Sequence, residues 1–569
     1  MEAVPLEDQS LTFDALPIDI ILLILEFVRP LDIISVRLTC KLLRDVTRQH
    51  ALWISALRTV CYDNNLYPEM FAVEALSLSQ LEHSATTPSL FFRQVKRAAE
   101  SASAAKEKME REEDGNTPSD PAPESVTPSL RPAVVRRLDI PPSTLDGLNW
   151  AFTEDVTELR LAPGGRYLAM NHYCDMQIWD LGFWSSDTPR IIANHSFPDT
   201  GDFVLYGIWI KPDGRGLQIQ TNFLCMEPPQ NELAIWEIYP ASENPTLELI
   251  ASLTRGPLLT YECRGGSKIA ISELNRVGVW DPSLNTLVTW EVPEGMTTML
   301  VVQDRAVCLY QDHIAVYDVP HIQGRPSGAL VEEAREMAPI WTTLLSYSAD
   351  DYYLPASWPY TADLGSPRGD LYFALTEAVP ARNYIYRVPA SPRSAKEAPA
   401  IALAAVANVQ GAGTERLENY LQRPVRLCEG HLALMSEPSA RGVVCLQILE
   451  EPTISRQRSL QGQERSSDRP ATIPTVPANP SSALVAPTPA APHAPAGHDT
   501  SVSQASELRE SWTGDEAEGM RVPTWTVLLF EADYEIVDFE FDGASGRACA
   551  ITEDYTVLVL DYIESPATT

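Results

Sequence analysis

The sequence predicts an α+β multidomain chain, in which an all-α helical module at the N-terminus is followed by a large all-β region. Leu and Ile recur at helical spacing between residues 11 and 100, and that stretch contains no Gly. From residue 134 onward, short runs of β-branched and aromatic residues alternate with turn residues. The 569 residues are more than one small domain needs, so separate modules can each have a core.

Net charge and the N-terminal residues exclude several classes of function. The formal net charge of −34 repels phosphate backbones and anionic lipids, so we expect neither nucleic-acid nor membrane binding. The first ten residues lack the basic segment of a secretory signal, and the apolar stretch 18–28 is too short to span a bilayer. Nine scattered cysteines without a C-x-x-C pair suit a reducing compartment, so we expect a cytoplasmic or nuclear protein.

Changes in composition divide the chain into segments. Residues 452–515 are rich in Pro, Ser, Ala and Gln and cannot bury enough apolar surface to offset the entropy of ordering. Strand-like text resumes after them, so this segment interrupts the β region. The predicted segments are a disordered N-terminus (1–10), the helical module (11–60), a helical spacer (61–108), a disordered linker (109–133), the β region (134–451 and 516–563) and a disordered insertion (452–515).

Helix signals are dense in the first of these folded segments. Pro17 and Pro30 stand where helices would begin, and Asp19 and Asp32 follow two residues later, where an acid complements the helix dipole. Apolar side chains recur on one predicted helix face at Ile20, Ile21, Ile24, Leu25 and Val28. Two further amphipathic runs follow, so we expect three or four short helices.

The segment from Leu16 to Trp53 resembles an F-box. The matching features include the opening Leu-Pro pair, the Pro30-Leu31-Asp32 tripeptide and the closing Leu-Trp pair. The resemblance implies binding to a Skp-type adaptor, and through it to a cullin and a RING subunit. By position it assigns adaptor contact to Leu16, Pro17, Ile20, Ile24, Leu25, Pro30, Leu31, Ile34, Val36, Arg37, Cys40, Leu43 and Trp53. The alternative is that some of these residues only pack the module's own core.

A degenerate repeat runs through the β region. An apolar strand that ends in an aromatic residue and an acid recurs four times, and three weaker copies follow. The seven copies are residues 177–181, 234–238, 278–282, 315–319, 384–388, 445–449 and 558–562. Turns rich in Pro, Asp and Gly precede many copies, as in LAPGGRYLAM at 161–170, and such residues suit tight antiparallel connections.

The repeat spacing is that of propeller blades. Trp179, Trp236, Trp280 and Tyr317 are separated by 57, 44 and 37 residues, which bracket the ~40–45 residues of a four-stranded blade. The region resembles a WD-repeat β-propeller with seven candidate blades, although the Gly-His dipeptide of that family is missing. Two β-sandwiches are the alternative. Residues 134–140 have no partner strand and the last copy lacks an outer strand, so we expect the two to pair and close the ring.

Motifs for catalysis or for a cofactor are missing from the sequence. No phosphate-binding loop, dinucleotide fingerprint or nucleophile elbow occurs, and the nine histidines never stand at metal-ligand spacing. Asp180, Asp281, Asp318 and Asp561 recur at one strand end, which favours a structural turn or hydrogen bond over acid–base chemistry. We expect no cofactor, no metal and no enzymatic activity of the chain itself.

These features together predict the substrate receptor of an SCF-type (Skp adaptor–cullin–F-box) E3 ubiquitin ligase. The F-box would bind the adaptor and the propeller would bind a protein substrate. A non-degradative interaction scaffold is the alternative, and a propeller hydrolase is a third possibility that lacks a catalytic constellation. The identity of the substrate is not readable from the sequence, because propeller ligands commonly bind at loops.

Overall fold

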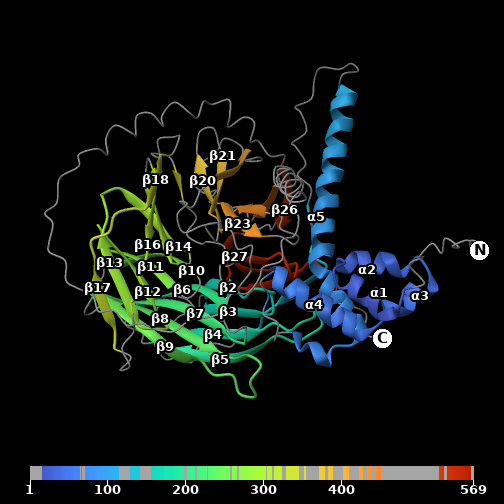
Figure 1. The fold of residues 1–569 in the computed structure, drawn as a ribbon, viewed down its shortest axis with the longest axis horizontal. Helices are drawn as coiled ribbons and strands as arrows, with labels where there is room; N and C mark the ends of the chain where they lie inside the picture. Colours follow the sequence, from blue (N-terminus) through green and yellow to red (C-terminus); the bar gives the residue numbers. More distant parts are fainter. Residues whose placement is uncertain are drawn as a thin grey trace, which may run out of the picture. The chain divides into compact units, whose positions relative to one another are not determined.

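The computed structural model describes residues 16–113, 129–140, 156–344 and 535–564 apart from short gaps, together with strands between 352 and 449 and at 524–530. Helices occupy the N-terminal part and strands the rest, as the sequence predicts (Figure 1). The segments 1–10 and 452–515, predicted to be disordered, lie outside the described residues, as does most of the predicted linker 109–133.

Five α-helices and a 3-10 turn form the N-terminal part. They are α1 (Ile18–Leu25), α2 (Pro30–Arg37), α3 (Lys41–Val46), α4 (His50–Asn64), η3 (Val73–Ala75) and α5 (Leu78–Glu113). Pro17 is the N-cap of α1 and Pro30 is the first residue of α2, so both prolines mark helix starts as expected. A capping box begins α5, in which the Ser77 and Gln80 side chains each accept a hydrogen bond from the other's backbone N–H. We call α1–α4 the helical module.

The strands of the first four sheets lie between residues 156 and 344. In sheet order they are β2 (Val156–Leu161), β3 (Tyr167–His172), β4 (Asp175–Asp180) and β5 (Arg190–Ser196); β6 (Gly201–Ile210), β7 (Leu217–Met226), β8 (Pro229–Ile238) and β9 (Glu248–Arg255); β10 (Leu259–Gly265), β11 (Lys268–Glu273), β12 (Arg276–Asp281), β13 (Thr286–Glu291) and β17 (Val331–Ala334); and β14 (Met296–Val302), β15 (Arg305–Tyr310), β16 (His313–Asp318) and β18 (Trp341–Leu344).

Three further sheets complete the β region. They are β19 (Tyr352–Tyr353), β20 (Leu371–Glu377), β21 (Arg382–Val388) and β22 (Ala402–Asn408); β23 (Gln422–Arg426), β24 (Leu432–Ser436), β25 (Val444–Leu449) and β26 (Thr524–Phe530); and β27 (Ile536–Asp542), β28 (Arg547–Thr552), β29 (Val557–Asp561) and β1 (Val134–Arg137). Every pairing between neighbours is antiparallel except the parallel addition of β17 to the edge of β13.

Each copy of the sequence repeat forms the third strand of a sheet. The seven copies coincide with β4, β8, β12, β16, β21, β25 and β29, and each of these strands lies between the second and fourth strands of its sheet. The tryptophans of the first three copies, Trp179, Trp236 and Trp280, are buried, so they are core residues as predicted. In the first turn, Gly164 and Gly165 have φ values of 90° and 70°, which other residues rarely adopt.

Closure of the β region follows the prediction from the sequence. Strand β1 pairs with β29 in an antiparallel register from Val134 opposite Asp561 to Arg137 opposite Leu558. Strand β2 packs against β27 and β28 of the last sheet and against β6 of the second sheet. The N-terminal strand therefore completes the last sheet, and the first sheet packs on the last, as in a β-propeller. The blade count of seven stays a prediction, because the fifth and sixth sheets border segments outside the described residues.

The long insertion lies within one sheet. Strand β25 ends at Leu449 and β26 begins at Thr524, and these two residues are partners in the same antiparallel pair. The two strands that flank the insertion are therefore neighbours, so the insertion interrupts the propeller without ending it, as predicted.

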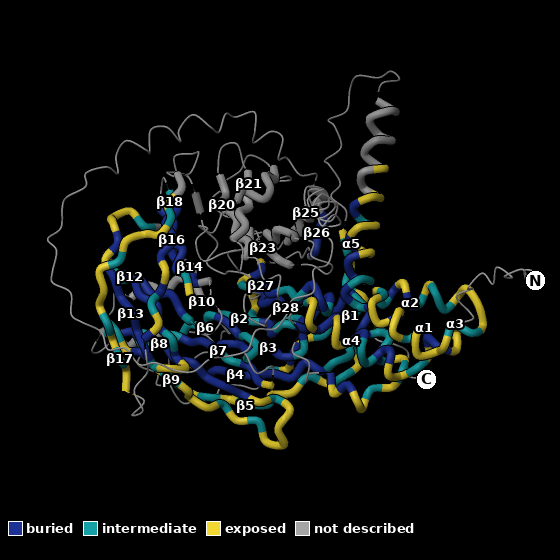
Figure 2. The backbone as a smooth tube through the Cα atoms, viewed as in Figure 1, coloured by how far each residue is buried: buried dark blue, intermediate teal, exposed yellow. Residues whose placement is uncertain are grey.

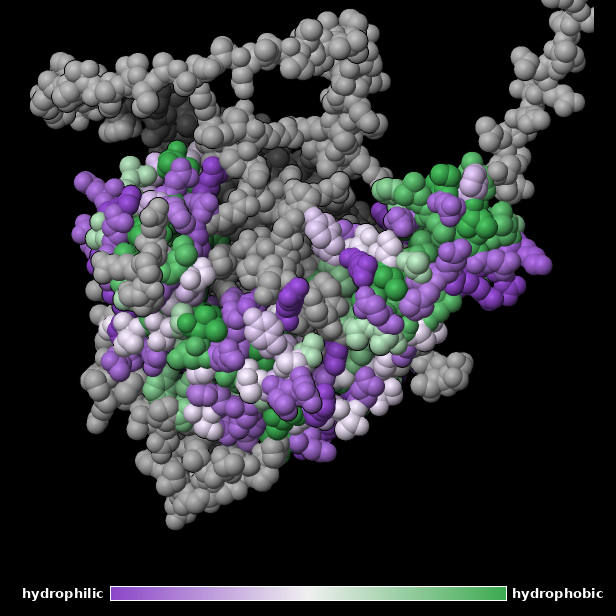
Figure 3. All heavy atoms as spheres, turned by 60° about the horizontal axis from the view of Figure 1, so that its bottom comes forward, coloured by the Kyte–Doolittle hydropathy of each residue, from purple (hydrophilic) through white to green (hydrophobic). Residues whose placement is uncertain are grey.

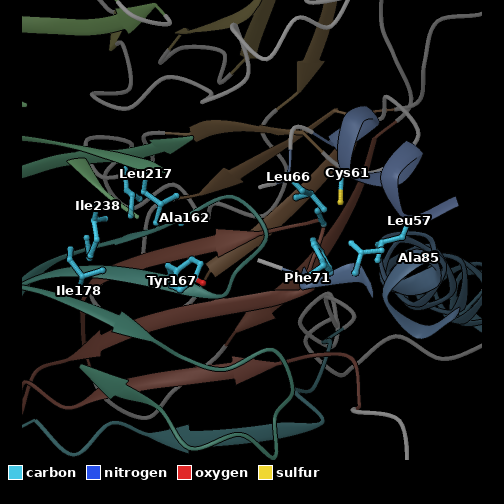
Figure 4. Packing of buried hydrophobic residues seen from close by; sticks show 14 of the residues in the cluster. Leu57, Cys61, Leu66, Phe71, Ala85, Ala162, Tyr167, Ile178, Leu217 and Ile238 are labelled. Atoms are coloured by element: carbon cyan, nitrogen blue, oxygen red, sulfur yellow. The ribbon is translucent and has the colours of Figure 1, made fainter. Parts of the chain in front are cut away.

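Buried apolar residues continue from the helices into the strands (Figure 2). One cluster joins helical residues such as Leu57, Phe71 and Ala85 to strand residues such as Tyr167 and Ile178 (Figure 4). A second cluster joins residues of α5 to the last two sheets. The helical module, α5 and the propeller thus share cores. No helix among the described residues is long and apolar enough to cross a membrane.

Candidate functional site

An exposed apolar stripe runs along α1 and into the turn after it. Ile20, Leu23, Ile24 and Phe27 follow the i, i+3, i+4, i+7 spacing of one helix face. Their exposed fractions are 44, 52, 39 and 86%. Ile21 and Leu25 occupy a different face of α1 and are buried against the rest of the module. Helix α1 therefore has one apolar face for its own core and a second that is exposed.

The thirteen residues assigned to adaptor contact fall into three groups. Pro17, Ile20, Ile24 and Cys40 are exposed. Half-buried positions are Leu16, Pro30, Ile34, Val36, Arg37 and Leu43. Leu25, Leu31 and Trp53 are buried, so for these three the core role left open by the sequence is the one that the structure shows. The adaptor contact stays a prediction for the exposed and half-buried groups.

Two of the predicted contact residues hold the module together. The Trp53 ring N–H donates to the backbone oxygen of Thr47 at 2.7 Å, and the Arg37 guanidinium lies 5.6 Å from the centroid of that ring. Arg37 also donates two hydrogen bonds to Glu82 on α5, at 2.9 and 2.6 Å. A paired, two-bond contact of this kind fixes orientation as well as position. Arg37 and Trp53 therefore link α2, α4 and α5.

Four exposed apolar residues on α1 and directly after α1 and α2 are not among the predicted contacts, and the first is Ile18, which is 48% exposed. Leu23 and Phe27 belong to the stripe on α1, and Leu38, directly after α2, is 82% exposed. The sequence shows that these residues are apolar. A helical-wheel projection of α1 would have shown that its apolar residues lie on two faces, of which only one can face the core. Figure 3 shows apolar side chains gathered over this end of the molecule.

The helical part packs directly on the propeller through aromatic contacts. On the propeller side the partners come from the first and last sheets. The ring pairs, with their centroid distances, are Phe71 with Phe183 at 4.8 Å, His83 with Trp184 at 5.2 Å, Phe91 with Phe541 at 5.4 Å and Phe91 with Tyr562 at 5.9 Å. Helix α5 also contacts β26. These packed rings hold the predicted helical spacer against the propeller, a contact that was not predicted from the sequence.

The predicted linker is shorter than expected at both of its ends. Helix α5 continues to Glu113, and Leu130 donates its backbone N–H to Leu528 of β26 at 2.9 Å. Residues 109–113 therefore belong to the helix, and residues 129–133 lie along the propeller. The part between them is outside the described residues.

A cleft lies between α5 and the turns of the first and last sheets, and its charged groups are already paired. Arg166 donates from Nε to Asp180 at 2.8 Å, and Arg547 forms an ion pair with Asp561. Burial lowers the pKa of His83 at the edge of the cleft. The guanidinium groups serve as structural ties between strands, so the cleft offers no free charged pair for catalysis among the described residues.

The four repeated acids have structural partners. Asp318 and Asp561 pair with arginines on the neighbouring second strand of the same sheet, and Asp180 pairs with Arg166, directly before that strand. Asp281 instead accepts a hydrogen bond from the backbone N–H of Ser283 at 3.0 Å and so holds a turn. These contacts confirm the structural interpretation of the repeat. No group of His, Cys, Asp and Glu suited to a metal occurs in the part of the chain that the structure describes.

Comparison with protein-family models identifies the helical module. The F-box-like family matches residues 13–67, which begins and ends later than the predicted 11–60. Residues 13–67 are an F-box-like domain. The exposed stripe of α1 therefore lies on an F-box-like domain, and α5 connects this domain to the propeller.

Solved structures similar to the chain include two WD40 domains of low identity. The C-terminal WD40 domain of Sif2 is 10% identical, with a TM-score of 0.36, and the match covers 72% of this chain and 97% of that one. The WD40 domain of SCAP from fission yeast is 8% identical, with a TM-score of 0.33, over 72% of this chain and 82% of that one. No protein of curated function matches the sequence. The order of the sheets is what carries the propeller assignment.

Proposed function

We propose that this protein is the substrate receptor of an SCF-type E3 ubiquitin ligase. Its F-box-like domain would bind a Skp-type adaptor, which connects to a cullin and a RING subunit, and its propeller would bind the protein to be ubiquitinated. The observation that carries the proposal is the exposed apolar stripe of α1 on an F-box-like domain. Exposed apolar patches rimmed by polar residues are typical of protein interaction sites.

The stripe has the features of an interface centre. Phe27, at 86% exposure, would bury a whole aromatic ring on binding, and aromatic residues dominate interface energies. Ile20 and Ile24 flank it on the same face. Because Ile21 and Leu25 already hold the module together from the other side of α1, binding on the stripe needs no rearrangement of the core.

The proposed receptor is a binding protein without chemistry of its own. The repeated acids are engaged in structural contacts, and ubiquitin transfer would come from the enzymes that the cullin recruits. Packing of α5 on the propeller would hold the bound substrate at a set orientation to the adaptor, which a flexible tether could not do. We place the protein in the cytoplasm or nucleus, where its cysteines would stay reduced.

Substitution of Ile20 by Asp tests the proposal in cells. The change places a charge at the N-terminal end of the stripe and leaves the core of α1 intact, since Ile20 is 44% exposed. The wild type should co-purify with the adaptor and the cullin, and the variant should lose both while it keeps the proteins bound by the propeller. Those proteins should then become longer lived in cells that express the variant.

Two other outcomes would argue against the receptor. If the wild type recovers neither adaptor nor cullin, the proposal fails at its first step. If it recovers both, but the lifetimes of the propeller-bound proteins are equal in wild type and variant, the protein is a scaffold. Val537→Ala is the matched control, because Val537 is 46% exposed on β27, away from the stripe, and should behave as wild type.

A further inference from the structure

Lysine is rare in this protein and unevenly distributed. Seven of the 43 basic residues are lysines, and the rest are arginines. The first 113 residues contain four lysines and eight arginines, whereas the remaining 456 contain three lysines and 28 arginines. A uniform compositional bias would deplete lysine equally in both parts. The depletion is concentrated in the propeller and its insertion.

The two propeller lysines that the structure describes are largely buried and form ion pairs. The Lys211 ammonium lies 2.6 Å from Glu237 Oε2 and 4.7 Å from the centroid of the Tyr239 ring. The Lys268 ammonium pairs with Asp304. Each lysine side chain is only 15% exposed. The remaining propeller lysine, Lys396, lies outside the described residues.

Arginine occupies the exposed basic positions of the propeller. Among the described residues from 129 onward, no lysine is exposed, whereas five arginines are, namely Arg131, Arg137, Arg190, Arg215 and Arg335. The helical part differs, because Lys41 on α3 and Lys96 on α5 are both exposed. Lys106 and Lys108 follow further along α5.

We propose that Lys211 and Lys268 of the propeller are protected from self-ubiquitination and that modification of this protein favours the exposed lysines of its helical part over these two. The inference rests on the proposed function. In ubiquitin transfer, the lone pair of a deprotonated lysine Nζ attacks the carbonyl carbon of the enzyme–ubiquitin thioester. The C–N bond forms, the C–S bond breaks, the sulfur leaves as a thiolate with the bonding electrons, and the amine releases a proton.

The described basic side chains of the propeller are poor nucleophiles in this reaction, and the arginines and lysines differ in the reason. A guanidinium stays protonated at physiological pH and has no lone pair to offer, so the exposed arginines keep their charge without accepting ubiquitin. Lys211 contacts the Glu237 carboxylate, and its low exposure shields it from a bulky thioester. A receptor protected in this way could hold a substrate near the ligase and leave Lys211 and Lys268 unmodified.

A reconstituted reaction tests the inference. The purified chain is combined with adaptor, cullin, RING subunit, ubiquitin-activating and ubiquitin-conjugating enzymes, ubiquitin and ATP, and modified lysines are mapped by mass spectrometry. We expect ubiquitin on Lys41, Lys96 and the other α5 lysines and none on Lys211 or Lys268. Combined replacement of the four helical lysines and Lys396 by arginine, which leaves only Lys211 and Lys268, should reduce modification to the level without ligase.

A second variant tests the role of arginine on the propeller. Arg137→Lys, Arg190→Lys and Arg335→Lys together keep the charge and add three exposed amines, so modification should rise and map to the new lysines. The same three positions changed to Gln form the control, since Gln adds no amine. Ubiquitin on Lys211 or Lys268 at the level of Lys96 would overturn the inference. So would an Arg→Lys variant modified no more than wild type.

Two separate readouts distinguish this inference from the proposed function. Co-elution of the wild type with adaptor and cullin before the reaction reports the proposed function, and failure there would overturn both. Reaction of the chain alone with an amine-reactive ester reports lysine access without any ligase. Lys96 should react fast and Lys211 and Lys268 slowly, and equal rates would overturn the inference even if the ligase assembles.

Discussion

Substitution of Phe91 by Ala should destabilise the propeller, although Phe91 belongs to a helix. The Phe91 side chain is fully buried, and its ring lies 5.4 Å from Phe541 and 5.9 Å from Tyr562, at the end of the last sheet. A buried Phe covers ~200 Å², of which Ala would keep about a third, so the lost transfer free energy at ~25 cal/mol per Å² is about 3 kcal/mol. The cavity left behind raises the expected loss to about 3–5 kcal/mol.

Urea unfolding followed by tryptophan fluorescence measures this effect, because four buried tryptophans (Trp179, Trp236, Trp280 and Trp290) lie in the propeller, whereas Trp53 is the buried tryptophan of the described helices. A Trp53→Phe background removes the signal of the helical module. The midpoint of Phe91→Ala should fall clearly below that of wild type. Phe27→Ala is the matched control, since it removes the same side chain from a position that is 86% exposed, and its midpoint should change little. Equal midpoints for the two variants would show that the helical part is only tethered to the propeller, and would refute the shared core.

Three further predictions follow from the closure and the repeat. Asp561→Asn should lower the unfolding free energy by about 3–5 kcal/mol, because Asp561 is the buried partner of two arginines. Asp318 is an exposed copy of the same position, so Asp318→Asn should lower it by at most about 1 kcal/mol in the same urea titration. Burial alone would raise the pKa of Asp180, but Arg166 holds it below its ordinary value, so the stability that Asp180 contributes is present above about pH 4 and lost as the pH falls through its folded-state pKa. The stability difference between wild type and Asp180→Asn should therefore be largest near neutral pH and shrink in acid, and a difference independent of pH would contradict this. Replacement of 452–515 by a short Gly/Ser bridge should leave the thermal midpoint nearly unchanged, because β25 and β26 are direct neighbours, and a large drop would show that the segment contributes to the fold.

The sequence predicted the β region well, because its signal is local and repeated. Each copy of the repeat could be placed at one position in a sheet without knowledge of the other strands, and all seven copies, full and weak, are third strands. Closure could also be predicted, since an unpaired strand at 134–140 and an incomplete last sheet imply each other. The parallel addition of β17 to β13 was not predicted, because a strand of four half-buried and exposed residues is too short to carry a periodic signal.

The candidate site was predicted only in part. Position in the F-box pattern spread the predicted contacts from Leu16 to Trp53, and it could not separate Ile24, which is exposed, from Leu25, which is buried. That distinction depends on where α2 to α5 pack, which is a tertiary property. The packing of α5 on the propeller was missed for the same reason. From the sequence, Phe91 is indistinguishable from an ordinary helix-core residue, and only the structure shows that it packs against the last sheet.

Direct titration of the purified protein with a Skp-type adaptor tests the central claim, that the stripe of α1 is the adaptor-binding surface. Calorimetry gives the affinity of wild type, Ile20→Ala, Phe27→Ala and the off-stripe control Val537→Ala. Each stripe variant should lose about 1–2 kcal/mol, roughly tenfold in affinity, and the control should equal wild type. If the wild type does not bind, or if the stripe variants bind as tightly as Val537→Ala, the stripe of α1 is not the adaptor-binding surface.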